Sequence, residues 1–270
     1  MSTQMPTLIS RNRGGVERTL ITVCMATYNG ERYLREQIDS ILNQEFKENS
    51  DLELELVISD DNSTDNTLRI IESYHDSRIR VVSHKNTKRY RYYNSVFACA
   101  ANFGNAIAHA RGEYIFLSDQ DDVWYPWKID RSVSVLRENG GGVVAAAFDM
   151  GDGELNKTGE VRFVKQNFFR HHYISTYGFS YGISKEILKY IMPLPEPSIH
   201  DVYIAATAIR LGKYHLLNES CAIHRWTGVH NVSKEGAVNT TPQLVRLYYR
   251  MRMWIIIMWR VWSRSRVVLA

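Results

Sequence analysis

Short apolar runs alternate with amphipathic stretches along the first 150 residues of the chain. The runs fall at residues 20–25, 52–58, 79–82, 114–118 and 143–148, and apolar runs of this length are typical of buried strands. The stretches between them place apolar residues three and four positions apart, as helices packed on a sheet do. This alternation predicts an α/β protein with a Rossmann-like, mostly parallel central sheet flanked by helices.

Four helices are expected among these strands, each with one apolar stripe. The stripes comprise Leu34, Ile38, Ile41 and Leu42; Leu68, Ile71 and Tyr74; Phe97, Ala101, Gly104 and Ala108; and Ile129, Val133 and Leu136.

Three helix boundaries are predicted from residues that favour helix ends. Ser63 or Thr64 suits the N-cap of the second helix, because a hydroxyl can accept a hydrogen bond from the first turn. Gly112 is expected to close the third helix as its C′ glycine. Pro126 suits the first position of the fourth helix, where no backbone N–H is needed.

The second half of the chain is less regular. A short helix is expected at 184–191, and the prolines of residues 192–197 then favour an extended segment. A helix at 202–211, closed by Gly212, and a strand at 215–224 complete the predicted elements.

Length and composition suit one large α/β domain, alone or with an appendage. The chain has 270 residues, of which 44% are hydrophobic, enough for a sizeable core. Its three cysteines are far apart and have no metal-type spacing, so we expect reduced thiols and a cytosolic protein. Residues 1–17 form a loose polar tail without a signal-peptide core. No apolar stretch reaches the roughly 18 to 20 residues of a transmembrane helix.

Positive charge gathers at the C-terminal end. The net charge is +4, yet without the six arginines that follow Glu235 the chain has 27 basic and 29 acidic residues. Residues 240–270 combine these arginines with apolar residues at helical spacing and predict a basic amphipathic helix. Two interpretations stay open: a helix lying on an anionic membrane surface through residues 243–270, or a helix packed on the body or on another subunit.

Three polar clusters follow three of the predicted strands. They are Thr27-Tyr28-Asn29, Asp60-Asp61 and Asp119-Gln120-Asp121-Asp122. The carboxyl ends of parallel strands share one edge of the sheet, where ligands bind, so the clusters should converge. Converging carboxylates repel one another, and a divalent cation such as Mg²⁺ or Mn²⁺ is the usual compensation. The glycine-rich phosphate loops of dinucleotide-binding proteins and P-loop enzymes are absent, so metal must hold any diphosphate.

At these motifs the chain resembles the family-2 glycosyltransferases with the GT-A fold, especially a bacterial rhamnosyltransferase-like branch. The resemblance covers residues 18–235, which we expect to form the glycosyltransferase domain. The matching segments are residues 22–30, 37–44, 57–65, 102–105, 112–124 and 200–201.

The resemblance implies an inverting transfer of a sugar from a nucleoside diphosphate to a hydroxyl group. By analogy, Asp119 and Asp121 hold Mg²⁺ or Mn²⁺, and Asp201 is the catalytic base. From the sequence alone Asp201 could instead cap the helix that follows it. The expected nucleotide-sugar-binding residues are Thr27, Tyr28, Asn29, Asp60, Asp61, Asp119, Arg225 and His230.

The resemblance also suggests the partners. The expected donor is linked to UDP or dTDP, with rhamnose as a candidate sugar, and the acceptor is a surface polysaccharide, an O-antigen or a lipid-linked glycan. We expect a protein at the inner face of the cytoplasmic membrane, with no nucleic-acid partner, and leave a homo-oligomer open. The alternatives are a catalytically idle nucleotide-sugar-binding scaffold protein and a nucleotidyltransferase.

Overall fold

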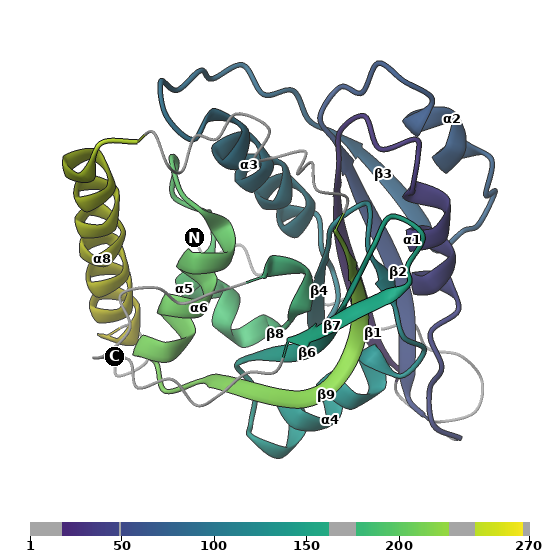
Figure 1. Cartoon of the computed structure of the whole chain (residues 1–270). Helices are drawn as coiled ribbons and strands as arrows, with labels where there is room; N and C mark the ends of the chain where they lie inside the picture. The colour runs from purple at the N-terminus through teal and green to yellow at the C-terminus, as the bar shows by residue number, and fades with distance from the viewer. Residues whose placement is uncertain (1–17, 49, 162–176, 227–240, 267–270) are drawn as a thin grey trace, which may run out of the picture.

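A nine-stranded mixed sheet with helices on both faces forms the centre of the computed structural model (Figure 1). The structure describes residues 18–48, 50–161, 177–226 and 241–266. The strands are β1 (Thr19–Thr27), β2 (Leu52–Asp60), β3 (Ile79–Ser83), β4 (Tyr114–Ser118), β5 (Val123–Trp124), β6 (Val143–Gly151), β7 (Lys157–Val161), β8 (Tyr181–Ser184) and β9 (Tyr214–Arg225). The α-helices are α1 (Leu34–Leu42), α2 (Thr67–Glu72), α3 (Asn94–Ala108), α4 (Lys128–Glu138), α5 (Leu188–Ile191), α6 (His200–Arg210) and α8 (Gln243–Arg266).

The sheet has a parallel half and a mixed half. Strands β3, β2, β1 and β4 are neighbours and all parallel. The order continues β8-β6-β9-β5, with β8 antiparallel to both its neighbours, β6 parallel to β9 and β5 antiparallel to β9. The predicted α/β class and mostly parallel sheet are therefore confirmed, and each predicted strand has a counterpart.

Two apolar layers hold the helices against the sheet. Ile21, Val23 and Met25 of β1 point into one layer with α1, α2 and α4. Cys24, between them, points into the other layer with α3, α6 and α8. Alternate side chains of a strand face opposite sides of a sheet, so a strand covered on both faces is apolar along most of its length, as β1 is from Leu20 to Met25 apart from Thr22.

Two antiparallel strands, β7 and β8, were not predicted. β7 pairs with β6 across a turn at residues 152–156, and β8 inserts between β4 and β6. β7 carries mostly exposed polar residues and β8 has four residues, so neither shows the apolar run that identifies a buried strand.

The three boundaries predicted for the helices of the first half are wrong, whereas Gly212, with a φ of 66°, closes α6 as predicted. Helix α2 has Asn66 rather than Ser63 or Thr64 at its N-cap, because Ser63 bonds to Asp60 instead. Helix α4 begins after Trp127, two positions beyond the predicted start at Pro126. Helix α3 ends at Ala108, and Gly112 lies beyond it without a positive φ.

Two predicted apolar stripes are also partly wrong. In α2 the buried residues are Thr67, Ile70 and Ile71, while Leu68 is 39% exposed. In α3 the core face is centred on Phe103, and Ala101 and Gly104 instead line a groove on the outer side. Small side chains are compatible with helical spacing on either face, so spacing alone did not separate the two.

The C-terminal helix α8 stands beside α5 and α6 at one side of the molecule (Figure 1). Its inner side buries Ile257, and Arg260 donates hydrogen bonds to the Ile191 carbonyl and the Tyr203 hydroxyl. The predicted C-terminal helix is therefore present and packs on the body. Within the described residues, no helix has the length and apolar character needed to cross a membrane.

We predict that Gly112→Ala destabilises the fold. A Cβ at this position would lie 2.6 Å from the backbone nitrogen of Thr22 and 2.8 Å from the carbonyl oxygen of Leu20, which cannot move without disturbing β1. Overpacking of this kind costs about 1 to 3 kcal/mol. The matched control is Gly159→Ala, whose Cβ would meet only Met150 at 3.9 Å. Thermal unfolding should show a lower midpoint for Gly112→Ala than for the control; equal midpoints would contradict this packing.

Candidate active site

The three polar clusters predicted from the sequence lie at one edge of the sheet. In the parallel register Thr27 stands opposite Asp60, and Met25 stands opposite Ser118, the residue before Asp119. The expected convergence of the clusters is therefore confirmed.

Thr27, Asn29 and Asp60 shape the loops at this edge. Oδ1 of Asp60 accepts hydrogen bonds from the hydroxyls of Thr27 (2.9 Å) and Ser63 (2.6 Å), and its Oδ2 accepts from the backbone N–H of Ser63. The Asn29 side chain accepts a hydrogen bond from the backbone of Thr64. These contacts lock the loops after β1 and β2 together.

Tyr28 presents its ring to solvent while its backbone is held in place. The residue is 57% exposed. Its backbone N–H donates to Gln120 Oε1 at 2.9 Å, and its carbonyl accepts from Gln120 Nε2 at 3.1 Å. Gln120 thereby ties the end of β1 to the loop after β4. An exposed tyrosine at this edge can stack on a planar ligand.

Asp61 faces away from this junction toward the loop that follows β3. Its Oδ1 lies 2.9 Å from Nδ1 of His84 and accepts a hydrogen bond from the Asn86 backbone at 2.7 Å. Asp60 and Asp61 therefore have different surroundings, although they are adjacent in the sequence.

Asp119, Asp121 and Asp122 are crowded together in the loop between β4 and β5. Burial, followed by the charges of Asp122 and Asp121, raises the pKa of Asp119 well above its usual range. Burial and the charge of Asp122 raise the pKa of Asp121 to about 6. Both side chains keep part of their surface in solvent, so the crowding occurs at an accessible edge.

Asp122, the last residue of this loop, is fully buried. Its Oδ1 is 2.7 Å from Nδ1 of His224 and accepts a hydrogen bond from the Arg225 backbone, whereas its Oδ2 has no hydrogen-bond partner among the described residues. Burial lowers the pKa of His224, but the hydrogen bond and charge of Asp122 outweigh it and raise the pKa overall.

The antiparallel pairing of β5 with β9 brings His224 and Arg225 to the carboxylates. Val123 pairs with Ile223, so the end of β9 lies next to Asp121 and Asp122. Arg225 is buried, stacks 4.2 Å from the Tyr33 ring centre and donates to the carbonyl oxygen of Asp121 at 3.0 Å. Its other guanidinium nitrogens donate to the Gly153 carbonyl and the Glu36 carboxylate.

A buried lysine lies below the acidic loop. Lys128 donates to the Phe179 carbonyl at 2.8 Å, and its ammonium lies 4.2 Å from the Trp124 ring centre. Burial lowers its pKa to about 8, against the opposing charges of Cys221, Asp122 and Asp119. Its positive form attracts the carboxylates above it.

Asp201 lies in the first turn of α6, on the same side as the acidic loop. The N-cap of α6 is Ile199, so the capping alternative for Asp201 is wrong; its Oδ1 accepts a hydrogen bond from the Val202 N–H instead. Burial raises the pKa of the Cys99 thiol, and the charges of Asp119, Asp201, Asp121 and Asp61 raise it further. Carboxylates from three segments, the loop 119–122, α6 and the loop after β2, therefore lie near Cys99.

The donor set at this edge fits a divalent cation shared with a substrate. Among the described residues no three His, Cys, Asp or Glu side chains form a ready-made metal cage. Mg²⁺, however, is usually held by one or two carboxylates together with substrate phosphates. The unpaired Oδ2 of Asp122 and the raised pKa of Asp119 and Asp121 show negative charge without full compensation. A bound cation would supply that compensation.

Some residues of the site were not found from the sequence, and one lies outside the described chain. Gln120, His224 and Lys128 act through contacts between distant segments, and the sequence assigned none of them a role. His230 lies outside the described residues. Every other residue predicted for the nucleotide sugar or the metal lies at this edge or beside it.

Comparison of the sequence with curated proteins finds glycosyltransferases. EpsE of Bacillus subtilis, described as a putative glycosyltransferase, is 36% identical over 44% of this chain and 39% of its own length. RfbG of Shigella flexneri, a dTDP-rhamnosyl transferase, is 37% identical over 42% of this chain and 36% of its own. WfgD of Escherichia coli is a UDP-Glc:α-D-GlcNAc-diphosphoundecaprenol β-1,3-glucosyltransferase. It is 28% identical over 44% of this chain and 42% of its own length. The chain thus matches well under two thirds of each relative.

Solved structures share the fold. The Staphylococcus aureus TarS fragment 1-349 in complex with UDP-GlcNAc superposes with a TM-score of 0.59 at 21% identity, covering 80% of this chain and 60% of the other. A Pyrobaculum calidifontis mannosyltransferase in complex with GDP-Man and Mn²⁺ has a TM-score of 0.52 at 19% identity, covering 87% and 62%. The sheet and its helices are therefore of the expected GT-A type. The family model described as glycosyl transferase family 2 matches residues 22–190, well over half of the chain, and the chain belongs to that family.

Proposed function

We propose that the chain transfers a sugar from a nucleoside diphosphate to a hydroxyl group, with inversion and with Mg²⁺ or Mn²⁺ bound. One observation carries the proposal: three crowded carboxylates, one with an unpaired buried oxygen, meet an exposed tyrosine at the carboxyl edge of the sheet. A site of this kind can hold a metal diphosphate beside a planar base.

In this proposal the loops after β1 and β2 hold the nucleoside. The exposed ring of Tyr28 stacks on the base, and Asp61 accepts a hydrogen bond from the base or the ribose. Thr27, Asn29 and Asp60 act differently, because their polar atoms already bond to neighbouring loops; they keep Tyr28 and Asp61 in position.

Asp121 and Asp119 are the proposed metal-holding residues. When bound, the metal neutralises the charge that develops on the leaving diphosphate. Asp122 is fully buried beside these two residues; one of its oxygens has no hydrogen-bond partner among the described residues, and the other is held by His224. Arg225 has a donor contact from each guanidinium nitrogen, so we assign it the positioning of Asp121 instead of direct contact with the diphosphate. His230 remains a candidate for that contact.

Asp201 is the proposed base. From the first turn of α6 its charge acts on Cys99 and Asp119, so it lies near the proposed metal-holding residues. Inversion requires a base on the side of the sugar opposite the leaving diphosphate, where it takes the proton from the acceptor hydroxyl. A helical position keeps the carboxylate in place while the acceptor binds.

The relatives narrow the substrates. A dTDP-linked or UDP-linked donor accords with RfbG and WfgD, and a glycan on a diphosphate lipid accords with the acceptor in the name of WfgD. We propose donors and acceptors of these classes, with rhamnose as a candidate sugar. The family match disfavours a nucleotidyltransferase; an idle nucleotide-sugar-binding scaffold would lack turnover on every acceptor.

We also propose that α8 lies on an anionic membrane surface. Its outer face consists of the exposed apolar residues of the helix, and α8 carries arginines but no acidic residue. The arginines Arg252, Arg260 and Arg264 turn inward and donate to backbone carbonyls of residues 191–197. An apolar face beside basic residues suits the boundary of an anionic bilayer. The outer face comprises Leu244, Leu247, Tyr248, Met251, Ile255, Met258, Trp259 and Trp262.

The first prediction concerns the metal. Asp121→Asn should lower the transfer rate about 100-fold or more, because the charge on the leaving diphosphate loses part of its compensation. The thermal midpoint of the metal-free protein at pH 7 should stay equal or rise. Burial raises the pKa of Asp121 to about 6, so its ionised form destabilises the fold at that pH. Asp130→Asn, on α4 beside Lys47, is the matched control. Full transfer by Asp121→Asn with every accepted donor would contradict the assignment.

The second prediction concerns the base. Asp201→Asn keeps the size of the side chain but cannot accept the acceptor's proton, so turnover should fall about 100-fold or more. Titration calorimetry with UDP and Mn²⁺ should give the same affinity as the unaltered protein within about twofold. Asp201 is not the base if turnover survives the substitution.

The third prediction concerns the membrane. The double substitution Ile255→Gln and Trp259→Gln should abolish co-sedimentation with vesicles containing phosphatidylglycerol, because it interrupts the outer face of α8. The control is Leu68→Gln, which alters an exposed apolar residue on α2. Unchanged vesicle binding, or a dimer in light scattering that the double substitution converts to monomers, would show that another surface or a second copy is involved.

A further inference from the structure

A groove that the proposed chemistry does not use runs between α3 and the segment 192–198. Its volume is about 270 Å³, several times the roughly 30 Å³ that a water molecule occupies. One wall consists of the small residues of α3 described above, and the other of the chain segment before α6. The lining residues include Ala101, Gly104, Ala108, Met192, Pro193 and Leu194.

The groove is narrow and mostly apolar along these walls, and His84, Asn105, Glu196 and Ser198 add polar groups to its lining. A Cβ added to Gly104 would lie 3.5 to 3.9 Å from the side chain of Leu194, so the two walls are close to van der Waals contact across that point. Small residues on one wall keep the space open. Such a space fits a thin apolar chain better than a ring system or a sugar.

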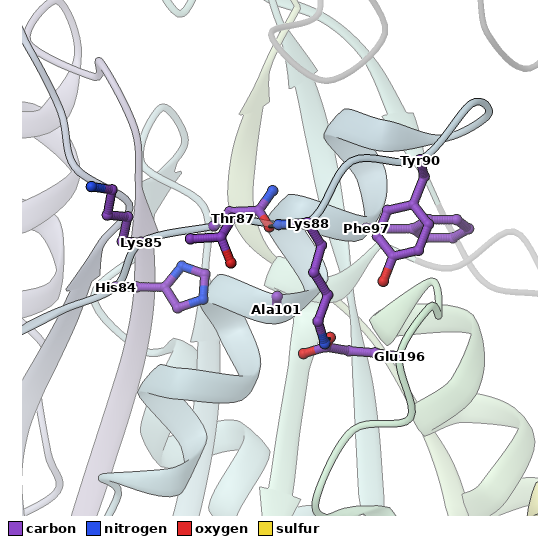
Figure 2. A pocket seen from close by; sticks show the side chains of 9 residues that line it. His84, Lys85, Thr87, Lys88, Tyr90, Phe97, Ala101 and Glu196 are labelled. Carbon is purple, nitrogen blue, oxygen red and sulfur yellow. Dashed lines mark hydrogen bonds and ion pairs between the residues drawn. The ribbon is translucent and has the colours of Figure 1, made fainter.

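A basic loop lines a second pocket that adjoins the groove and shares His84, Phe97, Ala101 and Glu196 with it. Residues 84–93 contain Lys85, Lys88, Arg89 and Arg91 and no acidic residue. Figure 2 shows this loop above Ala101 and Phe97, with Lys88 extending to Glu196 on the opposite wall. The ion pair of Lys88 with Glu196 spans the rim. The exposed ammonium groups of the loop favour an anionic ligand over a neutral one.

The groove adjoins α8. Phe97 lines the groove and also contacts Tyr249 of α8, with ring centres 5.2 Å apart. Arg252 of α8 donates to the carbonyls of Glu196 and Pro197, which belong to the wall. The helix proposed to lie on the membrane therefore also holds one side of the groove.

The groove also approaches the proposed base. Ser198 lines it, and Asp201 follows three residues later in the first turn of α6. His200, between them, stacks on Phe103 of α3 with ring centres 4.4 Å apart, which fixes the start of α6 against the other wall. A ligand lying in the groove would extend from the side of α8 toward Asp201.

We propose that this groove binds the isoprenoid chain of a polyprenyl-phosphate-linked acceptor, with the loop 84–93 beside the phosphate. The inference rests on the proposed function, for which it gives the binding place of the acceptor's lipid. An apolar channel, a basic rim and contact with the membrane-facing helix are together what a membrane-held anionic lipid requires. The chain anchors the acceptor in the groove and thereby brings the first sugar hydroxyl toward Asp201.

Binding of a fluorescent farnesyl phosphate, measured below its micelle concentration, tests the groove. Gly104→Leu fills the channel and should weaken binding at least tenfold, whereas Gly104→Ala, whose Cβ makes an ordinary contact with Leu194, should change it less than twofold. Ala101→Leu is a second filling variant if Gly104→Leu fails to fold. Equal affinity of a folded filling variant and Gly104→Ala would overturn the proposal.

Two further measurements identify the ligand, and a third separates failure of this inference from failure of the proposed function. Lys88→Met should weaken farnesyl phosphate binding at least threefold and leave farnesol binding unchanged, because farnesol lacks the phosphate. Dodecyl phosphate is a straight-chain competitor: weaker competition than that of farnesyl phosphate would support the isoprenoid assignment, and equal competition would assign the groove to anionic lipids in general and overturn it. UDP with Mn²⁺ should bind every variant equally. If the unaltered protein does not bind UDP with Mn²⁺, the proposed function is contradicted. Failure of the proposed function can therefore be told apart from failure of the groove assignment.

Discussion

The repulsion among Asp119, Asp121 and Asp122 is the constraint on which the site depends. Strand β4 ends at the carboxyl edge, and the chain places these carboxylates in the four positions that follow. Burial and mutual charge raise the pKa of Asp119 and Asp121, so their ionised forms are unfavourable in the metal-free protein. The two apolar layers between the sheet and its helices offset this cost, and groups with strongly shifted pKa values are common at functional sites.

The surroundings of the acidic loop limit that cost without removing it. His224 and the Arg225 backbone engage one oxygen of Asp122, and Lys128 supplies positive charge from below. Gln120 fixes the loop to the end of β1. The acidic loop is therefore held rigidly while its charge stays incompletely compensated, which prepares it for a cation and a diphosphate.

The parallel half of the fold could be predicted from the sequence because its strands are covered on both faces. Burial on both sides makes such a strand apolar along most of its length, and a strand such as β1 is visible without knowledge of its partners. The carboxyl edge followed from that half, and with it the convergence of the polar clusters. Strands β7 and β8 were missed because they are short or polar and are stabilised by pairing with β6.

Individual roles at the site could be predicted less well, since they depend on contacts across the fold. Asp60 and Asp61 look equivalent in the sequence, yet Asp60 is enclosed by hydroxyl groups and Asp61 faces the loop after β3. Arg225 was expected to bind the nucleotide sugar, but its burial against Tyr33 and Glu36 appears only in three dimensions. Gly112 looked like a helix terminator, whereas its small size serves close contact with β1.

The most direct test of a metal-dependent sugar-nucleotide site is thermal unfolding of the chain with a panel of nucleoside diphosphate sugars, each with and without Mn²⁺. A ligand that binds only the folded state raises the unfolding midpoint in proportion to the logarithm of its concentration. The account predicts that at least one UDP- or dTDP-linked sugar raises the midpoint when Mn²⁺ is present and has little effect without it. Stabilisation by the same sugar nucleotides that is equal with and without the metal would contradict it.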